Sequence, residues 1–190
     1  MAIIRVQGNA NASAVGNTTT VNLASNPVAG NLLIACIGTT SPGGYVAITS
    51  ITQVGVNWLN LGAGLQVAGQ FAFTWFNRAE IWVGIVGAGA GTAVTVNHGF
   101  IFTTTNICEY SGLVTAGFLD QTGTAGALAN ALNVSNALDT TQANELCVAC
   151  IVYLIDTQDN NSTFTFMDGV TNATLSVAFL EKSVNAIGIE

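Results

Sequence analysis

The apolar residues of this chain occur in short runs, and neither long stretches nor a helical spacing is visible. The runs are rich in Val, Ile, Thr and aromatic residues, and Gly, Asn, Ser or Pro interrupts them about every eight to twelve residues. The best candidate for a helical turn, residues 126–132, contains helix-breaking Gly and Asn. The pattern predicts an all-β protein: an antiparallel, jelly-roll-like β-sandwich of about ten strands with little or no helix. The candidate strands are residues 3–6, 18–23, 32–37, 47–53, 58–61, 71–76, 81–86, 93–97, 101–110, 146–155, 163–166 and 175–182.

Two long polar stretches separate these candidate strands. Residues 113–139 are rich in Gly and Ala and are typical of an extended connection across the end of a sandwich. Residues 7–20 are uncharged and form either an arm that lies across a neighbouring subunit or a surface loop. Because 190 residues correspond to one domain, we divide the chain into residues 1–17, an N-terminal arm or first edge strand, and residues 18–190, a single β-sandwich domain.

Charged residues are scarce, at 7% of the chain, where an ordinary domain has about 25%. The three basic residues are Arg5, Arg78 and Lys182, against ten acids. Nucleic-acid binding requires clustered Lys and Arg, so this class of partner is excluded, and an anionic membrane surface is excluded for the same reason. No apolar run approaches the roughly 20 residues of a membrane-spanning helix. The start of the chain lacks a signal-peptide pattern, which favours synthesis and assembly inside a cell.

The four cysteines lie inside apolar, strand-like runs. Cys147 and Cys150 have the CxxC spacing of redox and metal sites. In a strand, however, side chains three positions apart point to opposite faces of the sheet. We therefore interpret the cysteines as small buried hydrophobic residues in a reducing compartment.

Catalytic groups are few and show no pattern of an active site. His98 is the only histidine, and nothing near it in sequence supplies a nucleophile or a second metal ligand, so we interpret it as a turn-associated polar residue. Glu80 and Glu109 are candidate carboxylates for acid–base chemistry, but their separation in sequence indicates no pairing. The sequence therefore predicts a protein that is not an enzyme and has no cofactor.

Three acids form the best candidate cation site, because Ca²⁺ prefers carboxylate and amide oxygens. Asp156, Asp159 and Asp168 are accompanied by Asn160 and Asn161. The spacing is not that of an EF-hand. The alternative interpretation of the first two acids is a solvated hairpin loop.

Six aromatic residues lie close together in sequence, between positions 58 and 82. They would form either a platform for sugar rings or a stripe of core side chains, and alternation along a strand at 71–76 favours the core. The residues concerned are Trp58, Trp75, Trp82, Phe71, Phe73 and Phe76.

The run 146–155 is apolar on both faces, which is expected of a central strand covered by the opposing sheet and, on its other face, by a loop or a neighbouring subunit. Its residues Val148, Val152 and Leu154 are therefore candidate assembly residues. The start of the chain supplies the others, which are Ile3, Ile4 and Val6.

Four segments resemble a known family. They are Pro-Val-Ala-Gly-Asn-Leu-Leu-Ile-Ala at 27–35, Glu-Tyr-Ser-Gly-Leu at 109–113, Leu-Asp-Gln-Thr at 119–122 and Thr-Thr-Gln-Ala-Asn-Glu-Leu at 140–146. Together they resemble jelly-roll-like β-sandwich modules of phage and virus virion proteins and of prokaryotic cell-surface proteins. The likeness extends over most of the chain from about residue 18. The resemblance implies a fold and a particle or surface setting, and it implies no reaction.

The combined expectation is a non-enzymatic structural protein. The first hypothesis is a subunit of a virus or phage virion, a capsid or capsid-decoration protein that is assembled in the host cytoplasm. Its partners would be other copies of itself and a major capsid or shell protein. The alternatives are a subunit of an extracellular or cell-surface filament, joined by strand donation from residues 1–17, and a carbohydrate-binding β-sandwich module.

Overall fold

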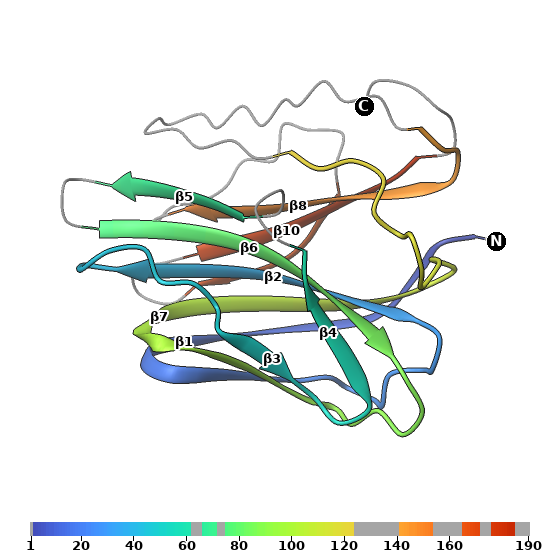
Figure 1. Cartoon of the computed structure of the whole chain (residues 1–190), viewed down its shortest axis with the longest axis horizontal. Coiled ribbons are helices and arrows are strands. Elements are labelled where there is room, and N and C mark those ends of the chain that lie inside the picture. The colour runs from blue at the N-terminus through green and yellow to red at the C-terminus, as the bar shows by residue number, and fades with distance from the viewer. Residues whose placement is uncertain are drawn as a thin grey trace.

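The computed structural model describes residues 2–61, 66–71, 75–123, 141–153, 165–171 and 176–184. In these residues the protein is all-β, with ten strands arranged in two antiparallel sheets (Figure 1). The predicted all-β antiparallel sandwich is thereby confirmed. The described part of the chain contains no helix suited to crossing a membrane.

Seven strands make the larger sheet, and three make the smaller one. In the larger sheet the order is β1-β7-β2-β6, and the far edge of β6 pairs with β5 along one part and with β4 along another. The smaller sheet has the order β8-β10-β9. The strands are β1 (Ile4–Asn22), β2 (Leu32–Ser41), β3 (Ser50–Thr52), β4 (Val56–Asn60), β5 (Gln66–Phe71), β6 (Trp75–Val86), β7 (Ala93–Ser111), β8 (Glu145–Tyr153), β9 (Thr165–Thr171) and β10 (Ser176–Val184).

The larger sheet curls back on itself through β1 and β7, the two longest strands. They pair with each other from end to end, and β1 carries register shifts between Arg5 and Gln7 and on both sides of Gly16. Such irregularities bend a strand and increase its twist. The far side of β7 pairs with β2 in its second half and with β3 in its first half. The sheet therefore approaches a closed barrel (Figure 1).

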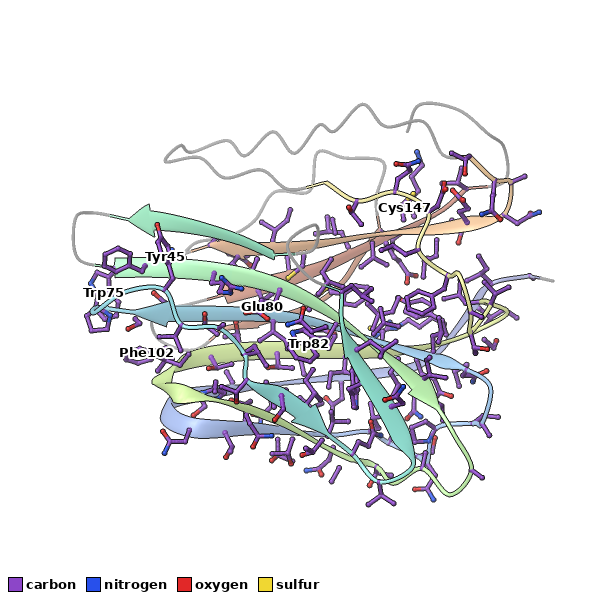
Figure 2. The ribbon with its side chains drawn as sticks, in the orientation of Figure 1. Tyr45, Trp75, Glu80, Trp82, Phe102 and Cys147 are labelled. Carbon is purple, nitrogen blue, oxygen red and sulfur yellow. The ribbon has the colours of Figure 1, made fainter. Side chains whose placement is uncertain are left out.

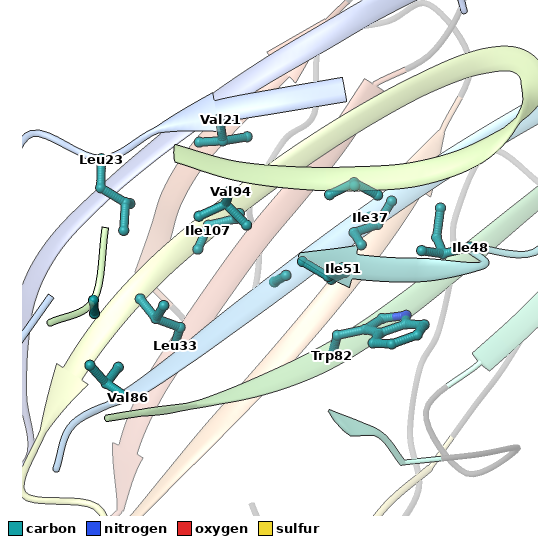
Figure 3. Close-up of a cluster of buried hydrophobic side chains, with 13 residues drawn as sticks. Val21, Leu23, Leu33, Ile37, Ile48, Ile51, Trp82, Val86, Val94 and Ile107 are labelled. Atoms are coloured by element: carbon teal, nitrogen blue, oxygen red, sulfur yellow. The ribbon is translucent and has the colours of Figure 1, made fainter. Parts of the chain in front are cut away.

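β2 divides the interior into two cores, because all ten of its residues are buried. Successive side chains of a strand point to opposite faces. Leu33, Ala35 and Ile37 belong to the first core, inside the curled sheet (Figure 3). Ile34 and Cys36 belong to the second core, between the two sheets.

Three predicted elements differ from the structure. Residues 7–20 belong to β1, which lies at one end of the strand order of the larger sheet, and are not a loop. The polar side chains of this segment concealed its strand character, although a first edge strand was one of the two alternatives for residues 1–17. The run 71–76 is not one strand: β5 ends at Phe71 and β6 begins at Trp75, and these two residues are antiparallel partners. The run 146–155 is not central, because β10 is the middle strand of the smaller sheet and β8 pairs with β10 alone among the described strands.

Candidate assembly surface

Four large apolar side chains are exposed where β1 begins and β7 ends. We call Ile4, Val6, Val28 and Val114 the end patch; their exposed fractions are 58%, 46%, 57% and 62%. Ile4 is the partner of Ser111, the last residue of β7, so the start of the chain lies beside the segment that carries Val114 (Figure 1). Exposed apolar side chains that gather in one place mark surfaces for association.

A buried carboxylate holds the middle of this end together. Glu109 is fully buried in β7. Its Oε1 accepts hydrogen bonds from the backbone N–H of Val28 at 2.8 Å and from Nδ2 of Asn31 at 2.6 Å, and its Oε2 accepts one from Nε2 of Gln7 at 2.6 Å. A buried carboxylate is stable only when donors replace its lost hydration. Glu109 therefore fixes the turn that presents Val28, and it connects the segments 27–35 and 109–113.

Gly112 lets the chain start cross the end of β7. Its φ is +85°, a conformation that side chains disfavour, and a Cβ at this position would overlap the carbonyl of Ala2. The close crossing places Ile3 and Ile4 next to the exit of β7. Ile3 packs on the second core, while Ile4 faces outward.

The polar half of β1 is held by a row of amide side chains. We call Gln7, Asn9 and Asn11 the amide ladder, because they recur at every second residue and share one face of the strand. Each donates to a backbone carbonyl in or just after the second half of β1. The acceptors are Ser25 at 3.0 Å, Asn22 at 2.7 Å and Thr20 at 2.7 Å, in that order. Amides thus join the two halves of β1 across the curl.

The same amides cap the backbone of the strand. The Oδ1 atoms of Asn9 and Asn11 accept from the backbone N–H groups of Ala10, at 2.9 Å, and Ala12, at 2.8 Å. An edge strand presents unpaired N–H groups that recruit other strands. Along this part of β1, two such donors are already satisfied by the side chains of the strand itself.

A second buried carboxylate, Glu80, serves the first core. It is 1% exposed and accepts from Nε1 of Trp82 at 2.8 Å, from the backbone N–H of Ile48 at 3.0 Å and from Nε of Arg78 at 2.5 Å. Because the indole N–H of Trp82 has this acceptor, its side chain is buried without an unsatisfied donor (Figure 2). Trp58 packs against the same core, and its Nε1 donates to Gln53. Neither indole is placed as an exposed sugar platform.

Glu80 and Glu109 do not form a catalytic pair. They are the partners of Ile37 and Leu33, on opposite sides of β2. The four-residue offset corresponds to roughly 13 Å along the strand. Glycosidase carboxylates lie at most about 9.5 Å apart. Both carboxylates are instead occupied in holding the fold.

His98 also has a structural environment, and the prediction of a turn position was wrong. It lies within β7, is 6% exposed, and contacts Thr19 Oγ1 at 3.0 Å through Nε2 and the carbonyl of Gly99 at 2.7 Å through Nδ1. Burial lowers the pKa of His98 below its usual value of 6.5. The imidazole of His98, inside the curled sheet, is therefore neutral above pH 6.5.

Asp120 makes the equivalent connection for the two remaining segments of the family resemblance. Its carboxylate accepts from the backbone N–H of Thr141 at 2.7 Å and from the Thr141 hydroxyl. These hydrogen bonds lower the pKa of Asp120, whereas desolvation and the neighbouring Asp120 raise the pKa of Glu145. Segments 119–122 and 140–146 thus meet through a carboxylate, as 27–35 and 109–113 do.

The opposite end of the larger sheet carries a group of aromatic rings. Tyr45 is 48% exposed and meets Phe76 edge-on, with ring centroids 5.0 Å apart. The ring centroids of Trp75 and Phe102 are 6.0 Å apart (Figure 2). We call these four residues the aromatic end.

The predicted site residues have different outcomes. Leu154, Asp156 and Asp159, with Asn160 and Asn161, lie outside the described residues. Asp168 is in β9 opposite Phe179. Among the described residues, no three His, Cys, Asp or Glu side chains are grouped so as to hold a metal ion.

Of the predicted assembly residues, Ile4 and Val6 are exposed. Val148 and Val152 are partly buried and pack against the second core, and their role in assembly stays a prediction. The sequence interpretation missed Val28 and Val114. Each stands beside Gly, Ala or Thr in a predicted turn or connection, where a single valine gives no periodic signal.

Comparisons with protein-family models, with curated proteins and with solved structures found no significant match to this chain.

Proposed function

We propose that this protein is a non-enzymatic structural subunit of a virus or phage particle, a capsid or capsid-decoration protein that assembles with copies of itself. The observation that carries the proposal is the end patch: four apolar side chains, each about half exposed or more, on a chain with few charges. Their burial against a second copy would remove apolar surface from water at about 25 cal/mol per Å² and would desolvate few charges. A shell protein is a further partner, and the virion is the corresponding location.

The rigidity of the end supports this role. Glu109 fixes the turn that carries Val28, and Gly112 fixes the crossing that carries Ile4. A preformed patch loses little conformational entropy when a neighbour binds. The buried carboxylates also have structural partners, which favours a structural protein over an enzyme.

The structure favours side-chain packing over strand donation as the mode of assembly. Residues 4–13 already pair with residues 103–111 of the same chain. To be donated to another subunit, this segment would have to break its pairing with β7 and the hydrogen bonds of the amide ladder. The filament hypothesis therefore requires a refolded N-terminal segment, which assembly through the end patch does not.

Size-exclusion chromatography with light scattering tests the proposal. The wild-type protein should elute as an oligomer or particle, and Ile4→Asp with Val114→Asp should reduce it to a monomer of unchanged circular dichroism. Val54→Asp is the matched control, because Val54 is 72% exposed near the β3–β4 turn, outside the patch. A wild-type monomer at high concentration that also binds no shell protein overturns the proposal.

The aromatic end supports a second candidate function, carbohydrate binding. Tyr45 presents a half-exposed ring braced by Phe76, and exposed rings of this kind stack against sugars. Glycan-array binding that is lost in Tyr45→Ala and retained in Val54→Ala would support it. Unchanged binding, or none with the wild type, would reject it.

A further inference from the structure

Three of the four cysteines come from three different strands into one core. Cys36 of β2, Cys108 of β7 and Cys150 of β8 belong to the second core or pack against it, and all are reduced. Cys36 and Cys108 are on the larger sheet, whereas Cys150 reaches them from the smaller one. Cys147 is also on β8, but it is three positions from Cys150 and therefore points to the other face.

At this point the side chains of β8 reach the main chain of β2. Packed sheets usually lie about 10 Å apart, whereas a disulfide needs Cα atoms about 4.4–6.8 Å apart. Gly38 of β2 has no side chain and so leaves room for Val152 of β8. A Cβ at this position would lie only 2.9 Å from Cγ2 of Val152. The thiol of Cys150 donates to the carbonyl of Ile37 at 4.0 Å, so this side chain reaches the main chain of β2 next to Cys36.

Cys36 is the partner that the geometry favours for Cys150. Cys36 lies in the second core and Cys150 packs against it, and the Cys150 thiol lies 4.0 Å from the carbonyl oxygen of Ile37, the residue that follows Cys36. Burial, and next the neighbouring Cys150, raise the pKa of the Cys36 thiol. Cys108 is opposite Ile34, diagonal to Cys36 on the adjacent strand, and its thiol donates to Asn106 Oδ1 at 3.6 Å. A diagonal pair in one sheet is about 7–8 Å apart, which is less favourable for a disulfide.

We propose that Cys36 and Cys150 are an oxidation site that forms a disulfide between the two sheets. The oxidant is a peroxide. The half-buried Cys150 loses its proton to solvent, and its thiolate attacks H₂O₂, breaks the O–O bond and forms a sulfenic acid with release of hydroxide. The released hydroxide removes the proton of the Cys36 thiol and becomes water, and the Cys36 sulfur attacks the Cys150 sulfur and releases a second hydroxide. This second hydroxide takes up the proton that Cys150 lost. The net reaction converts two thiols and H₂O₂ into one disulfide and two waters.

The bond would lock the smaller sheet onto the larger one and close a very long loop. Loops of this size give the largest gain from a disulfide, and the melting temperature of the folded protein should rise by on the order of 5–10 °C. This inference does not depend on the function proposed above.

The experiment treats the full chain with hydrogen peroxide, alkylates the remaining thiols without reduction and maps peptides by mass spectrometry. The expected product is a peptide pair joined through Cys36 and Cys150 that has lost two hydrogen atoms and is separated by dithiothreitol. Cys147→Ala, on the same strand, should retain the cross-link and the rise in melting temperature. Cys150→Ala should lose both.

A second variant keeps the inference testable if Cys150→Ala proves unstable. Cys36→Ala removes the other sulfur from a site whose volume alanine nearly fills, and it should also abolish the cross-link. A folded wild type that gains no disulfide under peroxide overturns the proposal. So does a disulfide that maps to Cys108 or Cys147.

Discussion

The core inside the curled sheet and the core between the two sheets share one strand, β2, but they are closed in different ways. The first core is bounded by hydrogen-bonded polar groups: the amide ladder on one side, and the carboxylates of Glu80 and Glu109 at its margins. The second core is closed mainly by packing of apolar side chains and thiols from separate sheets, with Tyr110 donating to Glu181 across the gap. Directional bonds therefore fix the geometry of the first core, and shape complementarity fixes that of the second.

The largest expected effect is on the first core. Glu109→Ala leaves the donors of Val28, Asn31 and Gln7 without their acceptor in a buried site. We expect a loss of about 3–5 kcal/mol in the free energy of unfolding, measured by urea denaturation. Asp120→Ala, at an exposed carboxylate, is the control and should change much less. Equal losses in the two variants would contradict a special role for the buried carboxylate.

Phe179→Ala tests the second core. Phe179 is fully buried and stacks on Tyr110, with ring centroids 6.4 Å apart. The cavity should cost about 3–5 kcal/mol. Hydrogen exchange should show the loss chiefly in β8, β9 and β10, while β2 and β6 stay protected. Uniform deprotection of both sheets would mean that the cores do not open independently.

Asn9→Ala removes one rung of the amide ladder. Its Nδ2 no longer reaches the carbonyl of Asn22, and the N–H of Ala10 loses its acceptor. We expect a loss of about 1–2 kcal/mol and faster exchange of the Ala10 amide. Asn22→Ala is the matched control, because only the backbone carbonyl of Asn22 takes part in that bond. Identical effects of the two changes would argue against the ladder.

Thr104→Val should act in the opposite direction. Thr104 is fully buried beside Gly38, and within the described part of the chain its hydroxyl has no hydrogen-bond partner. Valine has nearly the same shape and buries no unsatisfied hydroxyl, so stability should rise by about 1 kcal/mol. Thr40→Val is the comparison, because the Thr40 hydroxyl contacts Asn77. A destabilised Thr104→Val protein would contradict the assignment.

The smallest expected effect is a pH dependence from His98. Its pKa is lowered in the folded state, so the unfolded chain binds a proton first as the pH falls. This contribution to stability is complete above pH 6.5 and decreases as the pH falls toward the folded pKa. NMR titration of the imidazole and urea denaturation between neutral and mildly acidic pH measure it. His98→Gln should flatten the dependence, and a folded pKa above 6.5 would contradict the burial effect.

The apolar runs were sufficient to predict the strands that supply both cores. β2, β6 and β10 were recognisable because burial selects Val, Ile, Leu and Phe in their sequences. The part of β1 after Val6 showed no such apolar run, because Gln7, Asn9 and Asn11 alternate with the period of a strand but carry no hydropathy signal. The recurrence of an amide side chain at every second residue was the signal in the sequence that could have identified this part of the strand.

The position of β8, and the contribution of Val28 and Val114 to the end patch, could not be predicted for a different reason. Apolarity on both faces of 146–155 is equally compatible with a middle or an outer strand, because pairing depends on the backbone and not on side-chain type. The end patch is formed by chain segments that are far apart in sequence and meet through the pairing of β1 with β7, the hydrogen bonds of Glu109 and the crossing at Gly112. Such tertiary proximity leaves no local pattern.

The amide ladder has a consequence for the behaviour of concentrated protein. Exposed strand edges template amyloid-like stacking, and proteins commonly block them with charge or proline. This chain has very few charges available, and neither proline lies in the first half of β1. Asn9 and Asn11 block the edge with neutral side chains instead. When many copies are crowded on one surface, this edge is therefore less able to recruit the strand of another copy and start aggregation.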